Sequence, residues 1–562
     1  MAKYTFFLAL LCVLELSYIL ADVQESVQSK VVKISSGPVR GYKDEKTGIY
    51  EFYGIPYASA PTGEDRFKAP LPAPIWLETL EAVDKNIICP QYNDKSHPMH
   101  DPSKRIVEDC LIANVFVPDT DETNLPVVVY VHGGAYQIGN GLFLTPEDLV
   151  KQGNIIVVNF NYRLGIHGFL CLGTEGAPGN AGMKDQVAAL KWVNKNIAKF
   201  GGNPEDVTIA GYSAGSSAVE LLALSRSTRG LFHKVIPESG AGVGVWSVQQ
   251  NPVEIAQKYA MESLNYTADN VSELEAFYKT TPLDKMQIDS FLSSEPDSTF
   301  VFVPCVERPG PNAFLTEAPL DILKKGKFEK TPFLVGFSNM EGLFRIDVFN
   351  DWKDKMNEKF SKFLPADLKF SSEEEREEVA SAIKKFYFGD EAVSETTVQK
   401  FVDYFTDVIF AYPILRSVRL QVEAGNTDVF LYEFSYVEEA FYQMMPFKIR
   451  GANHCSQSVM VQNADLLNVL TPSENFEKMR KVMRELWIRF IKTGKPVKEP
   501  TSDFPSGWPA SSAEGSPYMQ LDLPPQLKGT LLPERARFWD DIYSKYYSTP
   551  QPPSTGVDHS EL

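Results

Sequence analysis

The chain has 562 residues, of which 43% are hydrophobic and 23% charged, values that are ordinary for a globular protein with a large core. Its formal net charge of −18 repels nucleic acid, and no basic patch with interleaved aromatic residues is present, so a nucleic-acid partner is disfavoured. No cysteines or histidines stand at zinc-ligand spacing with a second pair nearby, so we expect no metal site.

The first 21 residues have the features of a secretory signal peptide. A basic residue precedes a short apolar run that ends near Ala21, and Glu15 interrupts this run, which favours cleavage over a membrane anchor. The rest of the chain has no stretch long and apolar enough to span a membrane, so no stable membrane insertion is expected. We expect residues 22–547 to form the folded domain and the proline-containing residues 548–562 to form a flexible tail.

One of the six cysteines lies in the signal segment, which leaves an odd number for the oxidising secretory pathway. Cys89 and Cys110 flank a polar loop, and their spacing suits a disulfide in that compartment. Cys171, Cys305 and Cys455 are predicted to be free and buried. Two Asn-x-Ser/Thr sequences are candidates for glycosylation of a secreted surface loop, at Asn265 and Asn270.

Short β-branched runs alternate with helical patterns along most of the domain, which predicts an α/β architecture with a wound sheet. Near-continuous apolar runs are typical of strands that are buried on both faces of a largely parallel sheet. These runs occupy residues 126–131, 155–160, 207–211, 332–337 and 429–434. Amphipathic spacing predicts helices over about 183–200 and 474–492, and the charged, helical region 350–404 is a candidate cap over the active edge of the sheet.

The sequence GYSAG, residues 211–215, carries a candidate nucleophile. It follows the apolar run 207–211 and opens a predicted helix, a strand–turn–helix setting that exposes the Ser213 hydroxyl above the sheet. The small residues on either side of the serine are needed because strand and helix approach closely. A serine- and glycine-rich turn that merely starts a helix is the alternative interpretation of this motif.

A glycine-rich loop, HGGAY at residues 132–136, directly follows the apolar run 126–131. Backbone N–H groups fixed in such a loop can stabilise the oxyanion that develops during acyl transfer. A further N–H would come from Ala214, the residue after the candidate nucleophile. A simple glycine turn after a strand is the competing interpretation.

A serine hydroxyl needs an imidazole base, and the imidazole needs an acid to orient it. His454 lies after the run 429–434 and before the last predicted helix, as the order serine, acid, histidine requires. Glu341 follows the run 332–337, at the end of a strand where catalytic groups gather. The remaining histidines are assigned to the glycine-rich loop, to core-like positions or to polar segments: His132; His167 and His233; and His97, His100 and His559.

Together these motifs resemble the carboxylesterase and cholinesterase family, and the chain looks closest to insect carboxylesterases. The resemblance covers nearly all of the domain. Besides the two glycine motifs, it rests on YGIPYA at 53–58, PTGEDRFKAP at 61–70, EDCLIANVFVP at 108–118, NYRLG at 161–165, GNAGMKDQVAALKWV at 179–193 and FGGNPEDVTIAGYSAGS at 200–216.

The resemblance implies the α/β-hydrolase fold, a mostly parallel central sheet flanked by helices, and a serine esterase without metal or organic cofactor. It implies the following roles: Ser213 as nucleophile, Glu341 as acid and His454 as base; Gly134, Ala135 and Ala214 as oxyanion donors; Ser239 as a serine near the triad; Cys89–Cys110 as the first disulfide; and Arg66–Glu108 and Arg163–Asp185 as buried ion pairs. The cysteines of the family's second disulfide are absent.

Departures from the family pattern bear on the substrate. The usual HGGG is HGGA here, so a methyl group narrows the site while the backbone donor remains. Tyr212 precedes the nucleophile, where cholinesterases carry glutamate and juvenile hormone esterases usually carry glutamine, and no tryptophan lies between Cys89 and Cys110. A quaternary ammonium substrate is therefore disfavoured. Tyr136 and Tyr212 are the candidate pocket residues.

We therefore expect a carboxylic-ester hydrolase that acts on small neutral, apolar esters through an acyl-enzyme, in the clearance of odorant, pheromone or xenobiotic esters. The alternatives are an inactive adhesion or binding relative, a juvenile hormone esterase and a choline esterase. The ending HSEL resembles signals that bind a retrieval receptor, so residence in the endoplasmic reticulum lumen stands beside secretion as an expectation.

Overall fold

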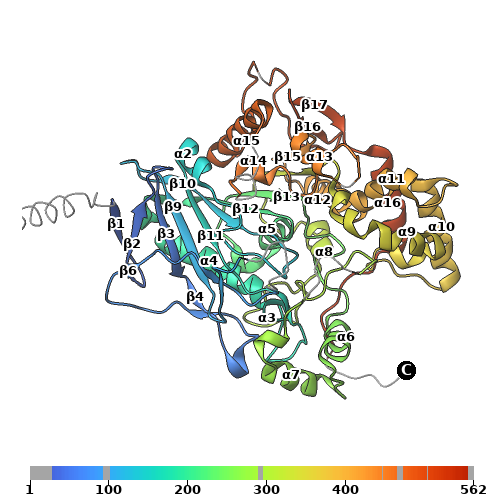
Figure 1. Ribbon diagram of the computed structural model, residues 1–562, viewed down its shortest axis with the longest axis horizontal. Helices are drawn as coiled ribbons and strands as arrows, with labels where there is room; N and C mark the ends of the chain where they lie inside the picture. The colour runs from blue at the N-terminus through green and yellow to red at the C-terminus, as the bar shows by residue number, and fades with distance from the viewer. Residues whose placement is uncertain are drawn as a thin grey trace, which may run out of the picture.

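The computed structural model describes residues 28–92, 101–288, 295–445, 447–464, 472–502 and 504–554 (Figure 1). The predicted signal segment 1–21, the HSEL ending and the histidines His97, His100 and His559 lie outside these residues. In the part of the chain that is described, no helix combines the length and the apolar character needed to cross a membrane.

A single large sheet organises the molecule, with 13 strands in the described residues. Its central strands are parallel from β11 to β16, and its two ends are antiparallel. In spatial order the strands are β1 (Ser29–Ile34), β2 (Gly37–Lys43), β3 (Tyr50–Pro56), β9 (Ile112–Val117), β11 (Ile156–Phe160), β10 (Leu125–Val131), β12 (Gly202–Tyr212), β13 (Lys234–Glu238), β14 (Phe333–Ser338), β15 (Val429–Phe434), β16 (Pro517–Leu521) and β17 (Gln526–Thr530), while β6 (Leu80–Glu81) pairs with β2.

Successive side chains of the central strands pack into two separate apolar clusters, one on each face of the sheet. In β10, Val127 and Val129 belong to one cluster, whereas Val128 and Tyr130 belong to the other. Because side chains alternate between the faces of a strand, burial of both faces requires a continuous apolar run. This confirms the mostly parallel sheet that the sequence predicted.

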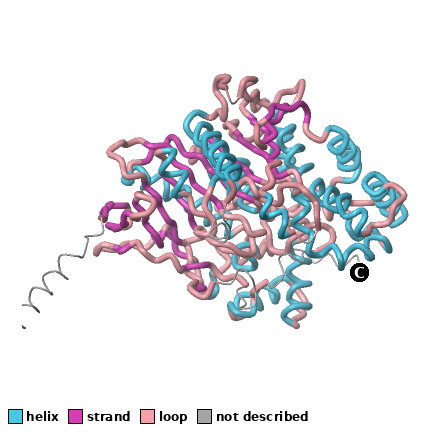
Figure 2. Tube along the Cα trace, turned by 45° about the horizontal axis from the view of Figure 1, so that its top comes forward, coloured by secondary structure: helices cyan, strands magenta, loops and turns pink. Residues whose placement is uncertain are grey.

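Helices cover both faces of this sheet, as Figure 2 shows. On one face lie α4 (Ala181–Asn196), α5 (Ala214–Leu224), α8 (Pro319–Lys324) and α12 (Tyr412–Glu423); on the other lie α2 (Glu147–Gly153) and α15 (Glu474–Thr493). The two helices that the sequence predicted are confirmed within a few residues, the first ending in a 3-10 turn, η2 (Ile197–Phe200). Further helices are α3 (Gly165–Phe169), α6 (Pro252–Leu264), α7 (Val271–Thr280), α13 (Glu439–Met444), α14 (Ser458–Val461) and α16 (Pro533–Tyr546).

The region proposed as a cap is helical, and it lies at the end of the molecule opposite β1 (Figure 1). It contains α9 (Phe349–Glu358), α10 (Glu373–Phe388) and α11 (Val398–Thr406), preceded by the 3-10 helix η5 (Glu341–Val348). A π-helical turn, η8 (Asp407–Ala411), joins α11 to α12. The flanking elements η5 and η8, rather than α9–α11, supply aromatic side chains to the active cavity described below.

The two disulfides differ in how well they were predicted. Cys89–Cys110 forms as expected, but Cys171 and Cys305, which were predicted to be free, are bonded to each other. Cys171 and Cys305 are 134 positions apart in the sequence, and they meet because Cys171 follows α3 and Cys305 lies in a loop that packs against the start of α4. Cys455 is the free cysteine of the described residues.

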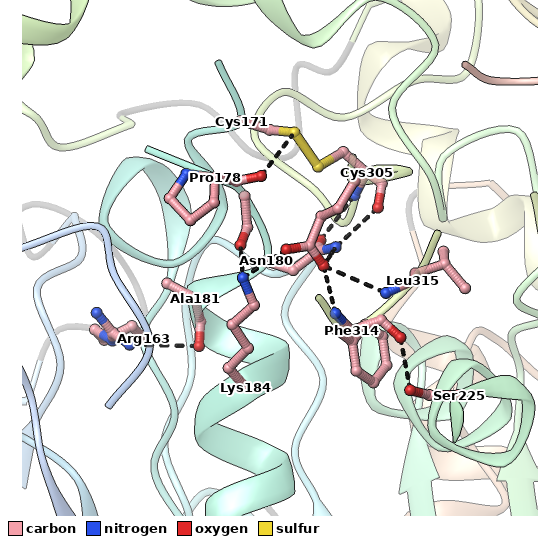
Figure 3. A network of polar contacts seen from close by, with 12 residues as sticks. Arg163, Cys171, Pro178, Asn180, Ala181, Lys184, Ser225, Cys305, Phe314 and Leu315 are labelled. Carbon is pink, nitrogen blue, oxygen red and sulfur yellow. Dashed lines mark hydrogen bonds and ion pairs between the residues drawn. A yellow bond between two sulfur atoms is a disulfide. The ribbon is translucent and has the colours of Figure 1, made fainter. Parts of the chain in front are cut away.

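A buried polar network surrounds the second disulfide (Figure 3). Asn180 donates to the Cys305 carbonyl and accepts from the Cys305 N–H, and it also donates to Glu307 at 2.8 Å. The Lys184 ammonium forms an ion pair with Glu307 at 2.5 Å and donates to the Gly179 carbonyl at 2.8 Å. Covalent and polar contacts therefore fix the loop around residue 305 to the start of α4.

The beginning of the predicted flexible tail is held against the domain. The Ser548 N–H donates to the Asp367 carbonyl at 2.8 Å, and the Arg308 side chain donates to the Pro553 carbonyl at 2.8 Å. Main-chain groups of residues 548 and 553 are therefore hydrogen-bonded to the domain.

Candidate active site

The turn after β12 places Ser213 at the start of α5 with a left-handed backbone, φ 55° and ψ −121°. The Ser213 N–H donates to the Glu238 carbonyl at 2.8 Å. The glycines on both sides are required by packing, because a Cβ on Gly211 would meet Gly215 and a Cβ on Gly215 would collide with the Val131 carbonyl. The turn therefore presents the hydroxyl while strand and helix remain in close contact.

Two further side chains converge on Ser213 from distant parts of the chain. His454 Nε2 lies 2.9 Å from Ser213 Oγ, and His454 Nδ1 contacts Glu341 Oε2. Glu341 opens η5 directly after β14, whereas His454 lies between β15 and α14. An imidazole that donates Nδ1–H to the carboxylate leaves Nε2 free to accept the serine proton.

Glu341 is completely buried, and its second carboxylate oxygen also accepts hydrogen bonds. Glu341 Oε1 accepts from the Ser338 N–H at 2.7 Å and from the Ser239 hydroxyl. Gln457 contacts both of these serines. Its amide nitrogen lies 2.5 Å from Ser239 Oγ, and its amide oxygen accepts from Ser338 Oγ at 2.7 Å. Gln457 is not predicted from the sequence, where its only signal is its position three residues after His454.

The glycine-rich loop lies beside Ser213 in a conformation that frees its amides. Gly134 and Ala135 have positive φ angles of 108° and 55°. A Cβ on Gly134 would collide with the Ile138 carbonyl, so this position requires glycine. Within the described residues no acceptor is paired with the N–H groups of Gly134, Ala135 or Ala214. Free amides from the loop and from the start of α5 suit an oxyanion.

A cavity of about 240 Å³ opens at Ser213 and His454. No acidic or basic side chain other than His454 lines it among the described residues. Its wall is formed by Gly133, Gly134, Ala135, Ile138, Gly139, Phe143, Tyr212, Trp246, Phe300, Phe344, Phe410 and Cys455. A largely apolar wall with a few polar groups at one point is typical of a site for an apolar small molecule.

Two aromatic rings hold the imidazole in place. Phe410 stacks on His454 with ring centroids 4.3 Å apart, and Phe344 packs edge-on at 5.1 Å. Phe410 belongs to the π-helical turn η8, a local irregularity that often occurs at functional sites. The Cys455 thiol lies 3.4 Å from His454 Nε2, and burial raises its pKa well above the ordinary value, so the thiol is neutral.

The two candidate pocket tyrosines have different positions. Tyr212 lines the cavity, as predicted. Tyr136 does not line it: the side chain is fully buried, its hydroxyl donates to Ser217 Oγ at 3.0 Å, and its ring packs against Phe169. The prediction for Tyr136 is wrong because the positive φ at this position directs the side chain into the core behind the glycine-rich loop.

The two predicted ion pairs are present outside the cavity. Arg163 Nη2 lies 2.6 Å from Asp185 Oδ1 in the core, and Arg66 Nε lies 3.4 Å from Glu108 Oε1. No group of three or more histidine, cysteine, aspartate or glutamate side chains in the described parts of the chain is arranged to hold a metal ion.

Comparison with known proteins agrees with this geometry. A family model described as the carboxylesterase family matches residues 28–539. The chain belongs to the carboxylesterase family. It is 34% identical over 488 residues to a carboxylic ester hydrolase of Bombus ignitus, covering 84% of this chain and 87% of that protein. The esterase is also 30% identical to the juvenile hormone esterase of Heliothis virescens over 96% of this chain and 98% of that protein.

The fold of the esterase agrees with a solved structure as well. A crystal structure of juvenile hormone esterase from Manduca sexta, with OTFP covalently attached, matches with a TM-score of 0.80 and 28% identity, covering 92% of this chain and 100% of that chain. The α/β-hydrolase fold and the family inferred from the motifs are therefore confirmed. The protein is a serine ester hydrolase of this family.

Proposed function

We propose that Ser213 attacks the ester carbonyl while His454 accepts the hydroxyl proton. The 2.9 Å contact between Ser213 Oγ and His454 Nε2 carries this assignment. Glu341 holds the imidazole in the required tautomer and stabilises its protonated form. The negative oxygen of the tetrahedral intermediate is placed against the N–H groups that the loop 134–135 and the start of α5 leave free.

His454 then returns the proton to the departing alcohol, which leaves an acyl group on Ser213. In the second half of the reaction, His454 takes a proton from a water molecule, the resulting hydroxide attacks the acyl carbon, and the carboxylic acid leaves as the serine proton is restored. Every proton is carried by one imidazole, so no metal or organic cofactor takes part in the proposed steps.

We propose that the substrates are neutral, apolar esters of modest size. The cavity of about 240 Å³ is walled by aromatic and aliphatic side chains, and the described residues place no carboxylate in it. Burial of an apolar group favours binding by roughly 25 cal/mol per Å², whereas a charged substrate would lose its hydration without a counter-charge. Odorant, pheromone and xenobiotic esters all belong to this chemical class.

The absence of a carboxylate from the described cavity wall disfavours choline esters, for which the aromatic rings alone would have to hold the cation. Juvenile hormone esterases among the relatives make a juvenile hormone substrate the second candidate. A series of esters graded in acyl and alcohol length, tested beside juvenile hormone and acetylthiocholine, separates these substrates by kcat/KM.

The mechanism is tested first with Ser213→Ala and a nitrophenyl acetate substrate. We expect the variant to lose at least about 10⁴-fold in kcat, because the remaining groups have no nucleophile to activate. Thermal unfolding of the variant provides the control for folding. Hydrolysis at the wild-type rate by folded Ser213→Ala would contradict the assigned nucleophile and would favour a relative that binds without catalysis.

We propose that the esterase matures in the secretory pathway, supported by its two disulfides. Between the two candidate glycosylation sites, the exposed Asn265 ends α6, whereas Asn270 caps α7 by accepting from the Glu273 N–H at 3.0 Å. We therefore favour a glycan on Asn265.

For the HSEL sequence, replacement of Glu561 by Ala should move the protein from the lumen to the medium if a retrieval receptor binds it.

A further inference from the structure

A second buried carboxylate, Glu238 at the end of β13, lies directly beneath the active site. It is completely buried and projects into the apolar cluster between the sheet and α15, where its neighbours include Tyr130 and Trp487. The adjacent side chain, Ser239, contacts Glu341, as successive residues at a strand end point to opposite faces. The proposed proton transfers make no use of the Glu238 carboxylate.

Three donors from three different elements converge on this carboxylate. Trp487 Nε1 on α15 donates to Glu238 Oε1 at 2.7 Å. The Ser458 hydroxyl at the start of α14 donates to Oε2, and the Tyr130 hydroxyl on β10 lies 3.3 Å from the same oxygen. A carboxylate is costly to bury in an apolar cluster unless its oxygens are hydrogen-bonded, so the three donors account for its presence.

Two of these side-chain contacts, and one main-chain contact of Glu238, lead to parts of the active site. Ser458 lies four residues after His454, at the start of the helix α14 that follows the turn containing the imidazole. Tyr130 lies in the strand that leads into the glycine-rich loop, and its ring stacks on Tyr212 in the cavity wall. The main-chain carbonyl of Glu238 itself accepts from the Ser213 N–H. One residue therefore contacts both the nucleophile turn and the segment that carries the base.

We propose that Glu238 is a positioning residue for the hydrolysis. Its side chain accepts a hydrogen bond from Ser458 and its main-chain carbonyl accepts one from Ser213, so Glu238 fixes the His454 segment relative to the Ser213 turn. This proposal rests on the proposed roles of Ser213 and His454. The ionised carboxylate is the form that positions the two segments, because it accepts hydrogen bonds from all three donors at once. A protonated carboxyl would have to donate its own O–H to one of the two hydroxyls, so at least one of these bonds would reverse its direction.

The charge of this group changes within the working pH range. Burial raises the pKa of Glu238 to about 7, against the opposing effect of its three donors. The titratable groups that face it are neutral at this pH, since burial raises the pKa of each well above its ordinary value. They are Tyr130, Tyr212, Tyr432 and Cys455. Glu341 acts electrostatically on Tyr432 and Cys455, and Glu238 forms no ion pair with any described residue.

The first test compares Glu238→Gln with Glu220→Gln. Glu220 is a matched control: it is equally buried, on α5, and bonds to the Gly242 N–H and Ser417 rather than to the His454 segment. For a short apolar nitrophenyl ester we expect Glu238→Gln to lower kcat about tenfold or more, with KM changed less than about twofold, because the cavity wall is untouched. We expect Glu220→Gln to stay within about twofold of the wild type in kcat.

The second readout is the acid limb of the pH profile of kcat/KM. Because Glu238 must be ionised, its protonation below about pH 7 should lower wild-type activity and add one proton to the slope of the acid limb. Glu238→Gln cannot take up this proton, so the limiting slope of its acid limb should be smaller than that of the wild type by about one. Ser458→Ala removes a donor to the carboxylate, which raises the Glu238 pKa. The acid limb of this variant should therefore lie at higher pH than that of the wild type.

Equal losses of kcat in Glu238→Gln and Glu220→Gln would overturn the proposal, as would a slope that is the same in Glu238→Gln and the wild type. If Glu238→Gln fails to fold, Ser458→Ala decides alone: an unmoved acid limb contradicts the proposal. Labelling of the wild-type protein by an organophosphate at Ser213 keeps the two questions apart. Failure to label Ser213 would refute the proposed nucleophile, whereas the slopes test only Glu238.

Discussion

At the scale of single residues, the site depends on backbone conformations that most side chains avoid. Ser213 adopts φ 55°, and Gly134 and Ala135 have positive φ angles as well. Such conformations cost of order 1–3 kcal/mol each for residues other than glycine and persist only where the surrounding structure enforces them. Here the close packing of Gly215 against Val131 enforces the nucleophile turn.

Gly134 provides a test of the oxyanion site. Alanine at this position would have to keep φ 108° and would collide with the Ile138 carbonyl, so the loop must shift. We expect Gly134→Ala to lower kcat by about 10²-fold or more, since an oxyanion donor is misplaced. Ala135→Gly is the control, because it keeps the backbone N–H and removes a methyl group. Wild-type kcat in folded Gly134→Ala would rule out this loop as the oxyanion site.

The sequence predicted the proposed catalytic side chains because each one follows a recognisable strand in a fixed order. It did not predict the contacts beneath them. Gln457 and Glu238 occupy no motif, and their roles depend on which segments meet in space. Tyr136 was misplaced because a residue beside a glycine turn can point either to the cavity or to the core, and only the backbone angle decides.

At the scale of elements, the cavity is assembled from segments that the two halves of the chain contribute separately. The loop around residue 305 supplies Phe300 to the cavity wall and is tied to α4 by the Cys171–Cys305 disulfide and the polar network of Figure 3. Next to Phe300, η5 and η8 supply Phe344 and Phe410. Apart from Tyr212 at the end of β12, the wall thus consists of residues from loops and turns.

The double replacement of Cys171 and Cys305 by serine tests the contribution of this bond. A disulfide that closes a loop of 134 residues stabilises the protein by about 5 kcal/mol in the chain-entropy model. We expect the variant to unfold at a clearly lower urea concentration than the wild type, under conditions that keep Cys89–Cys110 oxidised. An unchanged urea midpoint would show that the polar network alone fixes the loop.

The sequence predicted elements well where burial of both faces produces an uninterrupted apolar run, as in β10, β11 and β15. The same signal is absent from β1 and β2, which lie at one end of the sheet and alternate between buried and exposed positions. The pairing of Cys171 with Cys305 could not be read from spacing, because a bridge over so many residues follows from the tertiary fold.

At the scale of the whole molecule, burial of ionisable groups links the stability of the esterase to pH. Burial lowers the pKa of His132 to about 4 and that of His167 to about 3. The unfolded chain binds protons at these histidines near pH 6.5, whereas the folded protein does not, so these groups destabilise the fold as pH falls below 6.5. Burial raises the pKa of Glu238 from 4.5 to about 7 and that of Asp367 from 3.8 to about 6, so these two groups stabilise the fold as pH falls through those ranges.

His167→Asn isolates one of these contributions. At pH 7 the variant should be less stable than the wild type, because it leaves a space in the core beside Phe67. At pH 5 the wild type carries an added penalty of about 2 kcal/mol from the buried neutral histidine, which the variant lacks. We therefore expect the difference in unfolding free energy to shrink between pH 7 and pH 5. A difference that stays constant would show that His167 is protonated in the folded protein.

The central claim is that one hydroxyl, one imidazole and one carboxylate from three separate segments act together on an ester. The most direct measurement is peptide mass spectrometry of the purified protein after reaction with a dialkyl organophosphate. We expect one dialkylphosphoryl group per molecule, on Ser213, with loss of esterase activity in proportion to labelling, and no labelling in His454→Ala over the same time. Labelling at another residue, or full activity in a protein labelled at Ser213, would contradict the account.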